Sequence, residues 1–184
     1  MNEQIEVSVV MPCLNEERGV GICIAKIKDV FAREGIMGEI IVADNGSTDN
    51  SRQVAESLGA RVLSEPQKGY GAAYLCGLRQ AKGTYIVIGD SDDTYDFYDI
   101  PRFLKKLKEG CDFVIGSRFL GTMQRGAMSW THRYIGNPIL SSMTRLFFHT
   151  KLSDIHCGMR AFTRQAYDKM ELVTTGMEFA TEMV

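Results

Sequence analysis

Short apolar runs alternate along the chain with segments in which apolar residues recur every three or four positions. The short runs predict strands, and the three-to-four spacing predicts helices. The predicted strands are residues 5–11, 39–43, 61–63, 84–89 and 112–116. The predicted helices lie near residues 20–31, 54–58, 71–81 and 100–108. Strands that alternate with helices favour an α/β fold, in which helices cover both faces of a mostly parallel sheet.

This alternation weakens after Gly116. Residues 119–129 are rich in Gly, Met and Ser, which is typical of a loop, and residues 132–149 carry an apolar stripe at helical spacing. A strand over residues 159–163 and a helix over residues 164–172 follow. A chain of 184 residues can bury a core of its own. We therefore expect a single domain, residues 1–184, with halves of different character at 1–116 and 117–184.

Three polar clusters follow directly on predicted strands: Asn15-Glu16, Asp44-Asn45-Gly46 and Asp90-Ser91-Asp92. Ligands of parallel α/β sheets bind at the carboxyl ends of the strands. We therefore expect the three clusters to meet at one edge of the sheet and to form a site. The run Asn15-Glu16-Glu17 also has the composition of a helix N-cap, which predicts that a helix begins there.

Charge is distributed unevenly along the chain. Residues 90–99 contain five carboxylates and no basic residue, whereas residues 113–165 contain seven Lys or Arg and one acid, Asp154. This contrast suggests a metal and an anionic substrate side by side, although chance clustering on a solvated surface would give the same counts. The net charge of −2 argues against a nucleic-acid binder that works by bulk electrostatics.

Asp90-Ser91-Asp92 has the D-x-D spacing of carboxylates that hold a hard divalent cation together with substrate phosphates. An isolated D-x-D is more often an acidic turn or a helix cap. Here the position after a buried strand, among other polar strand ends, favours a metal site.

The stretch KGYGAAY, residues 68–74, is similar to a dinucleotide-binding fingerprint. The fingerprint fails, because its sixth position is Tyr74 and no strand precedes it. Lys68 and the backbone at Gly71 could still approach a phosphate at the start of a helix. A plain turn and helix start explains the stretch equally well.

Five cysteines, an odd number with no C-x-x-C pair, lie mostly in apolar surroundings. They indicate reduced cysteines and a cytoplasmic location. The first residues lack the basic and apolar regions of a signal peptide. No apolar run reaches the roughly 20 residues that span a bilayer.

Five motifs occur in order along the chain: VSVVMPCLNEE, EIIVADNGSTDNS, KGYGAAYLCGLRQAKGTYIVIGDSDDTYD, DFVIGSR and SDIHCGMRAF. Together they resemble the family 2 glycosyltransferases, and among these the polyprenyl-phosphate sugar synthases of the dolichyl-phosphate mannose or glucose type. The resemblance covers essentially the whole chain. It implies a GT-A, Rossmann-like fold and a nucleotide-diphosphate sugar donor, UDP-glucose or GDP-mannose.

The resemblance also implies roles for single residues. Asp90 and Asp92 would hold Mg²⁺ or Mn²⁺ on the donor pyrophosphate, and Asp44 would contact the base or the ribose. Asn45 stands where relatives often have a second acid. The first-strand loop that lines the nucleotide pocket in this family corresponds to Pro12, Asn15 and Glu16. On this reading, residues 1–116 are the nucleotide-sugar and metal half, and residues 117–184 are the acceptor half.

The implied acceptor is a polyprenyl phosphate, whose phosphate group is received in the region of Arg118, Arg133 and Asn137. Arginines suit a phosphate, and an ionised phosphate is a nucleophile that needs no general base. A hydroxyl acceptor would need a base, and Asp154 is the acid near enough to be a candidate. An ion pair between Asp154 and Arg160 is the competing interpretation.

The leading hypothesis is an enzyme on the cytoplasmic face of a membrane that transfers one hexose, with inversion, from a nucleotide sugar to a polyprenyl phosphate. Three alternatives stay open: a family 2 enzyme with a hydroxyl acceptor, a sugar-1-phosphate nucleotidyltransferase, and an inactive nucleotide-sugar binding module. Members of the family commonly continue into further helices or membrane spans, so we expect a catalytic segment of a longer protein. A homo-oligomer is compatible with the sequence.

Overall fold

The computed structural model describes residues 4–117 and 157–184. Within these residues six strands form one sheet, in the order β3-β2-β1-β4-β6-β5. The strands are Val7–Cys13 (β1), Gly38–Asp44 (β2), Arg61–Ser64 (β3), Tyr85–Ile88 (β4), Phe113–Ile115 (β5) and Arg160–Thr163 (β6). Strands β1 to β4 pair in parallel, whereas β6 runs antiparallel to β4 and to β5. The predicted mostly parallel sheet is confirmed.

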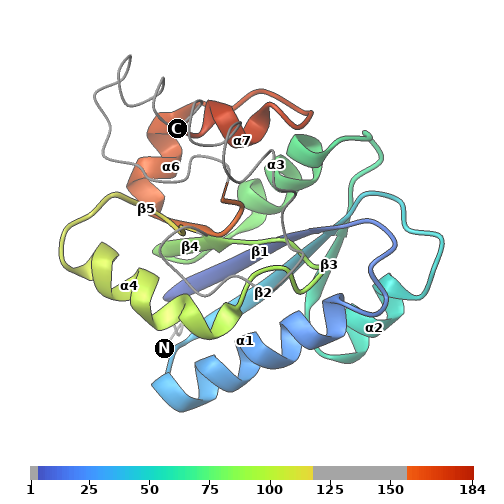
Figure 1. Ribbon diagram of the computed structural model, residues 1–184, viewed down its shortest axis with the longest axis horizontal. Coiled ribbons are helices and arrows are strands. Elements are labelled where there is room, and N and C mark those ends of the chain that lie inside the picture. Colours follow the sequence, from blue (N-terminus) through green and yellow to red (C-terminus); the bar gives the residue numbers. More distant parts are fainter. Residues whose placement is uncertain (1–3, 118–156) are drawn as a thin grey trace, which may run out of the picture.

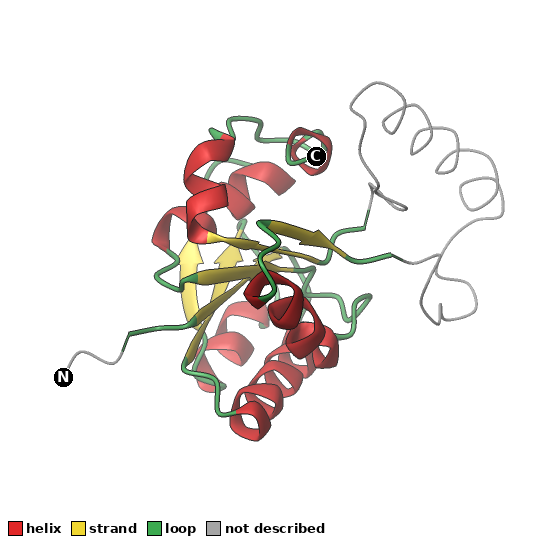
Figure 2. Cartoon of the chain, turned by 90° about the vertical axis from the view of Figure 1, so that its left-hand side faces the viewer, coloured by secondary structure: helices red, strands yellow, loops and turns green. Residues whose placement is uncertain are grey.

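Helices cover both faces of this sheet (Figures 1 and 2). One face carries α1 (Val20–Glu34), α2 (Ser51–Ser57) and α4 (Ile100–Lys108), and the short 3₁₀ helix η1 (Phe97–Asp99) leads into α4. The opposite face carries α3 (Tyr70–Gln80), α6 (Arg164–Met170) and α7 (Phe179–Glu182). In the parts of the chain that the structure describes, no helix has both the length and the apolar character required to cross a membrane.

Alternating side chains of β1 enter two separate cores. Val9 and Met11 pack toward α1, α2 and α4, whereas Val10 packs toward α3 and α7. All three side chains are fully buried. Because both faces of the sheet are covered, its strands are continuous apolar runs in the sequence. Helix α3 lies especially close to β1, since a Cβ on Gly77 would come within 2.4 Å of the Val10 side chain.

Each predicted strand is present. The sequence did not indicate which strands the last one would pair with. The strand predicted at residues 159–163 is β6, which inserts between β4 and β5. The second half of the chain thus supplies a strand to the same sheet as the first half. The loop predicted at residues 119–129 and the helix predicted at residues 132–149 lie outside the described residues.

The expectation that a helix begins at Asn15 is wrong. Helix α1 begins at Val20 after Gly19, and Asn15 adopts a left-handed backbone with φ of 60°. Its side chain does not cap a helix, because its Oδ1 accepts a hydrogen bond from the backbone N–H of Thr48 at 2.8 Å. Glu17 similarly accepts from the backbone N–H of Asn50 at 3.3 Å. These polar side chains tie the loop after β1 to the loop after β2.

Candidate active site

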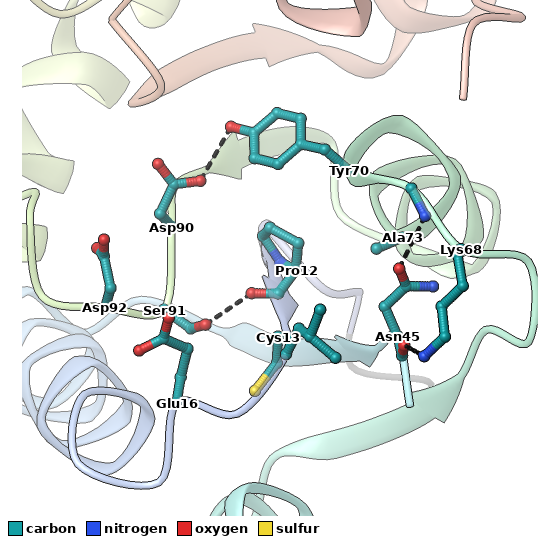
Figure 3. Close-up of a pocket in the computed structure, with 12 residues that line it drawn as sticks. Pro12, Cys13, Glu16, Asn45, Lys68, Tyr70, Ala73, Asp90, Ser91 and Asp92 are labelled. Carbon is teal, nitrogen blue, oxygen red and sulfur yellow. Dashed lines mark hydrogen bonds between the residues drawn. The ribbon is translucent and has the colours of Figure 1, made fainter. Parts of the chain in front are cut away.

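The loops that follow β1, β2 and β4 border a pocket of about 420 Å³ at the carboxyl edge of the sheet (Figure 3). Strand register brings them together, because Cys13 pairs with Asp44 and Val10 pairs with Ile88. Across β1 and β4, the Ser91 hydroxyl donates to the Pro12 carbonyl at 2.6 Å. The lining residues are Pro12, Cys13, Leu14, Glu16, Asn45, Lys68, Gly69, Tyr70, Ala73, Asp90, Ser91 and Asp92. The three polar clusters therefore meet, as the sequence predicts.

The structure divides the predicted site residues into three groups. Those that line the pocket are Pro12, Glu16, Lys68, Asp90 and Asp92. Those that support its walls are Asn15, Asp44 and Gly71. Those that lie outside the described residues are Arg118, Arg133, Asn137 and Asp154. The acceptor side of the site therefore stays a prediction, as does the ion pair between Asp154 and Arg160.

Asp44 closes the turn that follows β2. Its side chain is 2% exposed, and its two carboxylate oxygens accept from the backbone N–H groups of Gly46 and Ser47 at 3.3 and 3.1 Å. Arg52 lies 3.8 Å from the same carboxylate. Asp44 thus fixes the shape of a turn beside the pocket, in addition to any contact it makes with a ligand.

Asn45 joins this turn to residues 65–69, the segment that leads into α3. Its Nδ2 donates to the carbonyl oxygens of Glu65 and Gln67 at 3.0 and 2.7 Å, and its Oδ1 accepts from the N–H of Gly69 at 2.9 Å. Lys68 Nζ donates to the Asn45 backbone carbonyl at 2.5 Å (Figure 3). An aspartate could not donate the first two bonds. The amide at this position is therefore explained by the loop that it holds.

Gly71 admits a neighbouring backbone to the start of α3. The N–H groups of Gly71 and Ala72 donate to the carbonyl oxygens of Gly176 and Thr175 at 3.2 and 3.0 Å. A Cβ on Gly71 would lie 2.4 Å from the carbonyl oxygen of Thr174. The N–H groups of Gly71 and Ala72 thus bind protein carbonyls, so in this structure neither is available for the phosphate contact predicted at Gly71.

Three of the five carboxylates in residues 90–99 take part in salt bridges, which Lys26 and Arg102 supply. Lys26 Nζ lies 2.9 Å from Asp93 and 3.7 Å from Asp96, and Arg102 lies 2.9 Å from Asp99. The other two carboxylates, Asp90 and Asp92, face the pocket. The acidic run therefore has two parts: three carboxylates form salt bridges, and the other two line the pocket.

Three carboxylates converge in the pocket, because Glu16 joins Asp90 and Asp92. Burial first, and then the charges of Asp92, Asp49 and Asp90, raise the pKa of Glu16 above its usual range. Burial and the charge of Asp92 likewise raise the pKa of Asp90, against the opposing effect of its hydrogen bonds and of Arg160. Asp92 is exposed, and one of its oxygens accepts from the N–H of Thr94 at 2.9 Å.

These carboxylates fit a hard divalent cation, which prefers oxygen ligands and would relieve their mutual repulsion. Among the described residues, however, no three His, Cys, Asp or Glu side chains are arranged to hold a metal by themselves. A cation at this place would therefore take further oxygen ligands from a bound substrate or from water. That requirement matches the D-x-D interpretation of Asp90 and Asp92.

Tyr70 and Tyr74 are site residues that the sequence reasoning missed. Both hydroxyls donate to the same oxygen of Asp90, at 2.9 Å from Tyr70 and 3.2 Å from Tyr74. Burial, followed by the charge of Asp90, raises the pKa of both phenols far above the usual range, so they remain donors. Tyr74 lies in the helix predicted at residues 71–81 and Tyr70 directly precedes it. Their spacing of four residues, which places them on one face of a helix, was the signal available in the sequence.

Comparisons with known proteins identify the family and the fold. The profile of the family Glycosyl transferase family 2 matches residues 8–171. The chain belongs to this family. A crystal structure of glucosyl-3-phosphoglycerate synthase from Mycobacterium tuberculosis, in complex with Mn²⁺, UDP and phosphoglyceric acid, superposes with a TM-score of 0.75 at 25% identity, over 97% of this chain and 62% of that chain. The fold is thus the GT-A fold of glycosyltransferases.

Two proteins of Haloferax volcanii are similar in sequence. The low-salt glycan biosynthesis hexosyltransferase Agl6 is 43% identical over 96% of this chain, and the match spans 43% of its own length. A dolichyl-phosphate hexose transferase is 30% identical over 90% of this chain and 70% of its own length. The chain therefore spans less than half of Agl6 and corresponds to a part of that protein.

We expect Asn45→Asp to destabilise the protein by about 1–3 kcal/mol, the cost of hydrogen bonds left unmade. The substitution removes both donors to Glu65 and Gln67 and places a carboxylate against their carbonyl oxygens. Urea unfolding at pH 7 measures the loss, and Asn45→Ala gives the cost without the added charge. An Asn45→Asp variant as stable as the parent would show that the amide does not hold this loop.

We expect Glu16→Gln to stabilise the free protein at pH 7, by less than about 1 kcal/mol, because it removes one of the repelling charges. A carboxyl whose pKa is raised by folding favours the native state below its ordinary pKa of 4.5, and this contribution is lost as pH rises through the raised pKa. The stability gained by Glu16→Gln should therefore vanish when the pH falls below the ordinary pKa of 4.5. Urea unfolding of both proteins at pH 7 and at about pH 4 measures it. A destabilised Glu16→Gln at pH 7 would contradict the predicted repulsion.

Proposed function

We propose that the chain is the catalytic segment of an inverting hexosyltransferase that uses a nucleotide-diphosphate sugar and a divalent metal. The observation that carries the proposal is the convergence of Glu16, Asp90 and Asp92 in one pocket, opposite Lys68. The name of the hexosyltransferase Agl6 and the UDP and Mn²⁺ bound to the structural relative support it. UDP-glucose and GDP-mannose are the proposed donors.

The proposed donor site has two walls of opposite charge. Asp92 and Glu16, with Asp90 beside them, would hold Mg²⁺ or Mn²⁺, which when bound stabilises the negative charge of the leaving diphosphate. On the other wall, Lys68 supplies a positive charge beside the backbone carbonyl of Asn45. In this proposal Lys68 Nζ binds a phosphate oxygen of the donor in place of the Asn45 backbone carbonyl. Asp44 is proposed to contact the base or the ribose, and it also holds the turn beside them.

The proposed acceptor is a polyprenyl phosphate at the cytoplasmic face of a membrane. Support comes from the similarity to a dolichyl-phosphate hexose transferase and from the cationic character of residues 113–165. Arg118, Arg133 and Asn137 are proposed to receive the acceptor phosphate, which attacks without a protein base. In this proposal residues 1–116 supply the donor and metal half, and residues 117–184 supply the acceptor half.

A hydroxyl acceptor is the second candidate. The structural relative binds phosphoglyceric acid, and its name describes a glucosyl-phosphoglycerate product. Cationic residues would then bind a phosphate on the acceptor while a separate hydroxyl attacks. That chemistry requires a general base, for which Asp154 is the proposed residue.

The test of the metal site uses two neighbouring acids. We expect Asp92→Asn to weaken the Mn²⁺-dependent part of UDP or GDP binding roughly 10- to 100-fold, because it removes the accessible metal ligand. Asp93→Asn is the matched control, since Asp93 pairs with Lys26 away from the pocket. Isothermal titration with and without Mn²⁺ gives both values. Equal losses in the two variants would show that general charge, and not a D-x-D site, drives the binding.

The test of the acceptor compares Arg133→Ala with Asp154→Asn. With a phosphate acceptor, the arginine variant should lose about tenfold or more of hexose transfer to polyprenyl phosphate, the scale of a charged hydrogen bond, while it binds donor normally. The aspartate variant should keep most of the activity. Transfer of radiolabelled hexose into the lipid fraction measures both. Loss of transfer only in Asp154→Asn, with a normal fold, would indicate the hydroxyl acceptor instead.

A further inference from the structure

Asp90 and Asp92 belong to one D-x-D but have different surroundings. Asp90 is partly buried and receives two tyrosine hydroxyls on one oxygen, Oδ1. Its other oxygen faces the segment before β6, because a Cβ on Gly158 would lie 3.0 Å from Asp90 Oδ2. Asp92 is exposed, and it accepts a hydrogen bond from the N–H of Thr94 in the same loop. Asp90 is thus enclosed from two sides, whereas Asp92 is accessible from the pocket.

The two tyrosine rings are themselves held by packing. Tyr74 is fully buried. Its ring stacks on Phe179 of α7 with 5.4 Å between ring centroids, and it meets the Tyr70 ring edge-on with 4.9 Å between centroids. Arg160, 1% exposed, donates to the Ala180 carbonyl of α7 at 2.7 Å and to the Cys157 carbonyl at 2.9 Å. Helix α7 is therefore tied to β6, and through Phe179 it fixes the rings that hold Asp90.

The helix that carries these tyrosines also begins the opposite wall of the pocket. Helix α3 starts at Tyr70, directly after Lys68 and Gly69, and Asn45 holds the N–H of Gly69. Figure 3 shows Tyr70 reaching from this helix across the pocket to Asp90, while Lys68 lies on the far side beside Asn45. One helix thus sets the position of Asp90 relative to the Lys68 wall.

We propose that Tyr70 and Tyr74 are positioning residues that preset Asp90 for donor binding and leave Asp92 as the adjustable carboxylate of the pair. The inference rests on the proposed function, because it takes the ligand of Asp90 to be a metal-bound nucleoside diphosphate. A preset carboxylate loses less conformational freedom when a cation binds, so the two hydroxyls act on affinity through Asp90.

The experiment is a mutant cycle that combines Tyr70→Phe and Tyr74→Phe with Asp90→Asn. The double tyrosine variant keeps both rings and removes only the hydroxyls. Tyr167→Phe, which removes a hydroxyl from a half-buried tyrosine on α6, is the matched control. Each protein is titrated with UDP and with GDP, with and without Mn²⁺, and urea unfolding shows that each is folded at the assay temperature.

We expect the double tyrosine variant to lose about tenfold of the Mn²⁺-dependent affinity, the scale of a charged hydrogen bond, and to lose less of the affinity measured without metal. Added to Asp90→Asn, the same two substitutions should cause no further loss, because their effect passes through that carboxylate. Tyr167→Phe should bind as the parent does. A general loss of stability would weaken binding with and without metal alike, and its effect would add to that of Asp90→Asn.

Two results would overturn the inference. One is an unchanged Mn²⁺-dependent affinity in the double tyrosine variant, and the other is a loss that adds fully to that of Asp90→Asn. Failure of the proposed function looks different: the parent itself would bind neither UDP nor GDP more tightly with Mn²⁺. That outcome would remove the donor site and the positioning role together.

Discussion

Repulsion between carboxylates at the carboxyl edge of the sheet is the constraint on which this site depends. Asp90 and Asp92 follow β4, and Glu16 reaches the same pocket from the loop after β1. The pKa values of Asp90 and Glu16 are raised by burial and by neighbouring acids. The two apolar cores on either side of the sheet hold the strand ends together, and so they also hold these charges together. A cation and an anionic ligand would turn this unfavourable arrangement into a binding site.

The surrounding structure keeps the carboxylates from separating. Lys26 binds the loop after β4 through Asp93, and Asn15 ties the loop after β1 to that after β2. Asn45 then joins the loop after β2 to the start of α3. Each of these contacts links elements that lie far apart in the sequence. Together these contacts within the protein hold in place the loops that border the pocket, and electrostatic preorganisation depends on support of this kind.

The sequence predicted the layers and the edge of the sheet because both follow from local patterns. Apolar runs and helical spacing identified the strands and helices, and polar residues after three strands located the pocket. The position of β6 was not predictable in this way, since pairing between β4 and β5 is decided by contacts across the whole chain. The supporting roles of Asp44 and Asn45 were hidden for the same reason: an acid or amide at a strand end has the same local pattern whether it binds a ligand or a backbone N–H.

The surroundings of Gly71 were likewise not predictable from the local sequence. The open backbone at Gly71 was compatible with a phosphate, but the carbonyl groups of residues 174–176 occupy that space. Those residues are about a hundred positions away in the sequence, so no local pattern indicated the contact. Tyr70 and Tyr74 could have been found, because their helical spacing places both on one face of a helix that borders the pocket.

The measurement that tests the central claim most directly is anomalous diffraction from crystals of the protein grown with Mn²⁺ and UDP or GDP. The account predicts one manganese peak in the pocket, bound by the Asp92 carboxylate and by the diphosphate of the nucleotide. Nucleotide in the pocket with no manganese beside Asp92, or manganese bound only elsewhere, would contradict it.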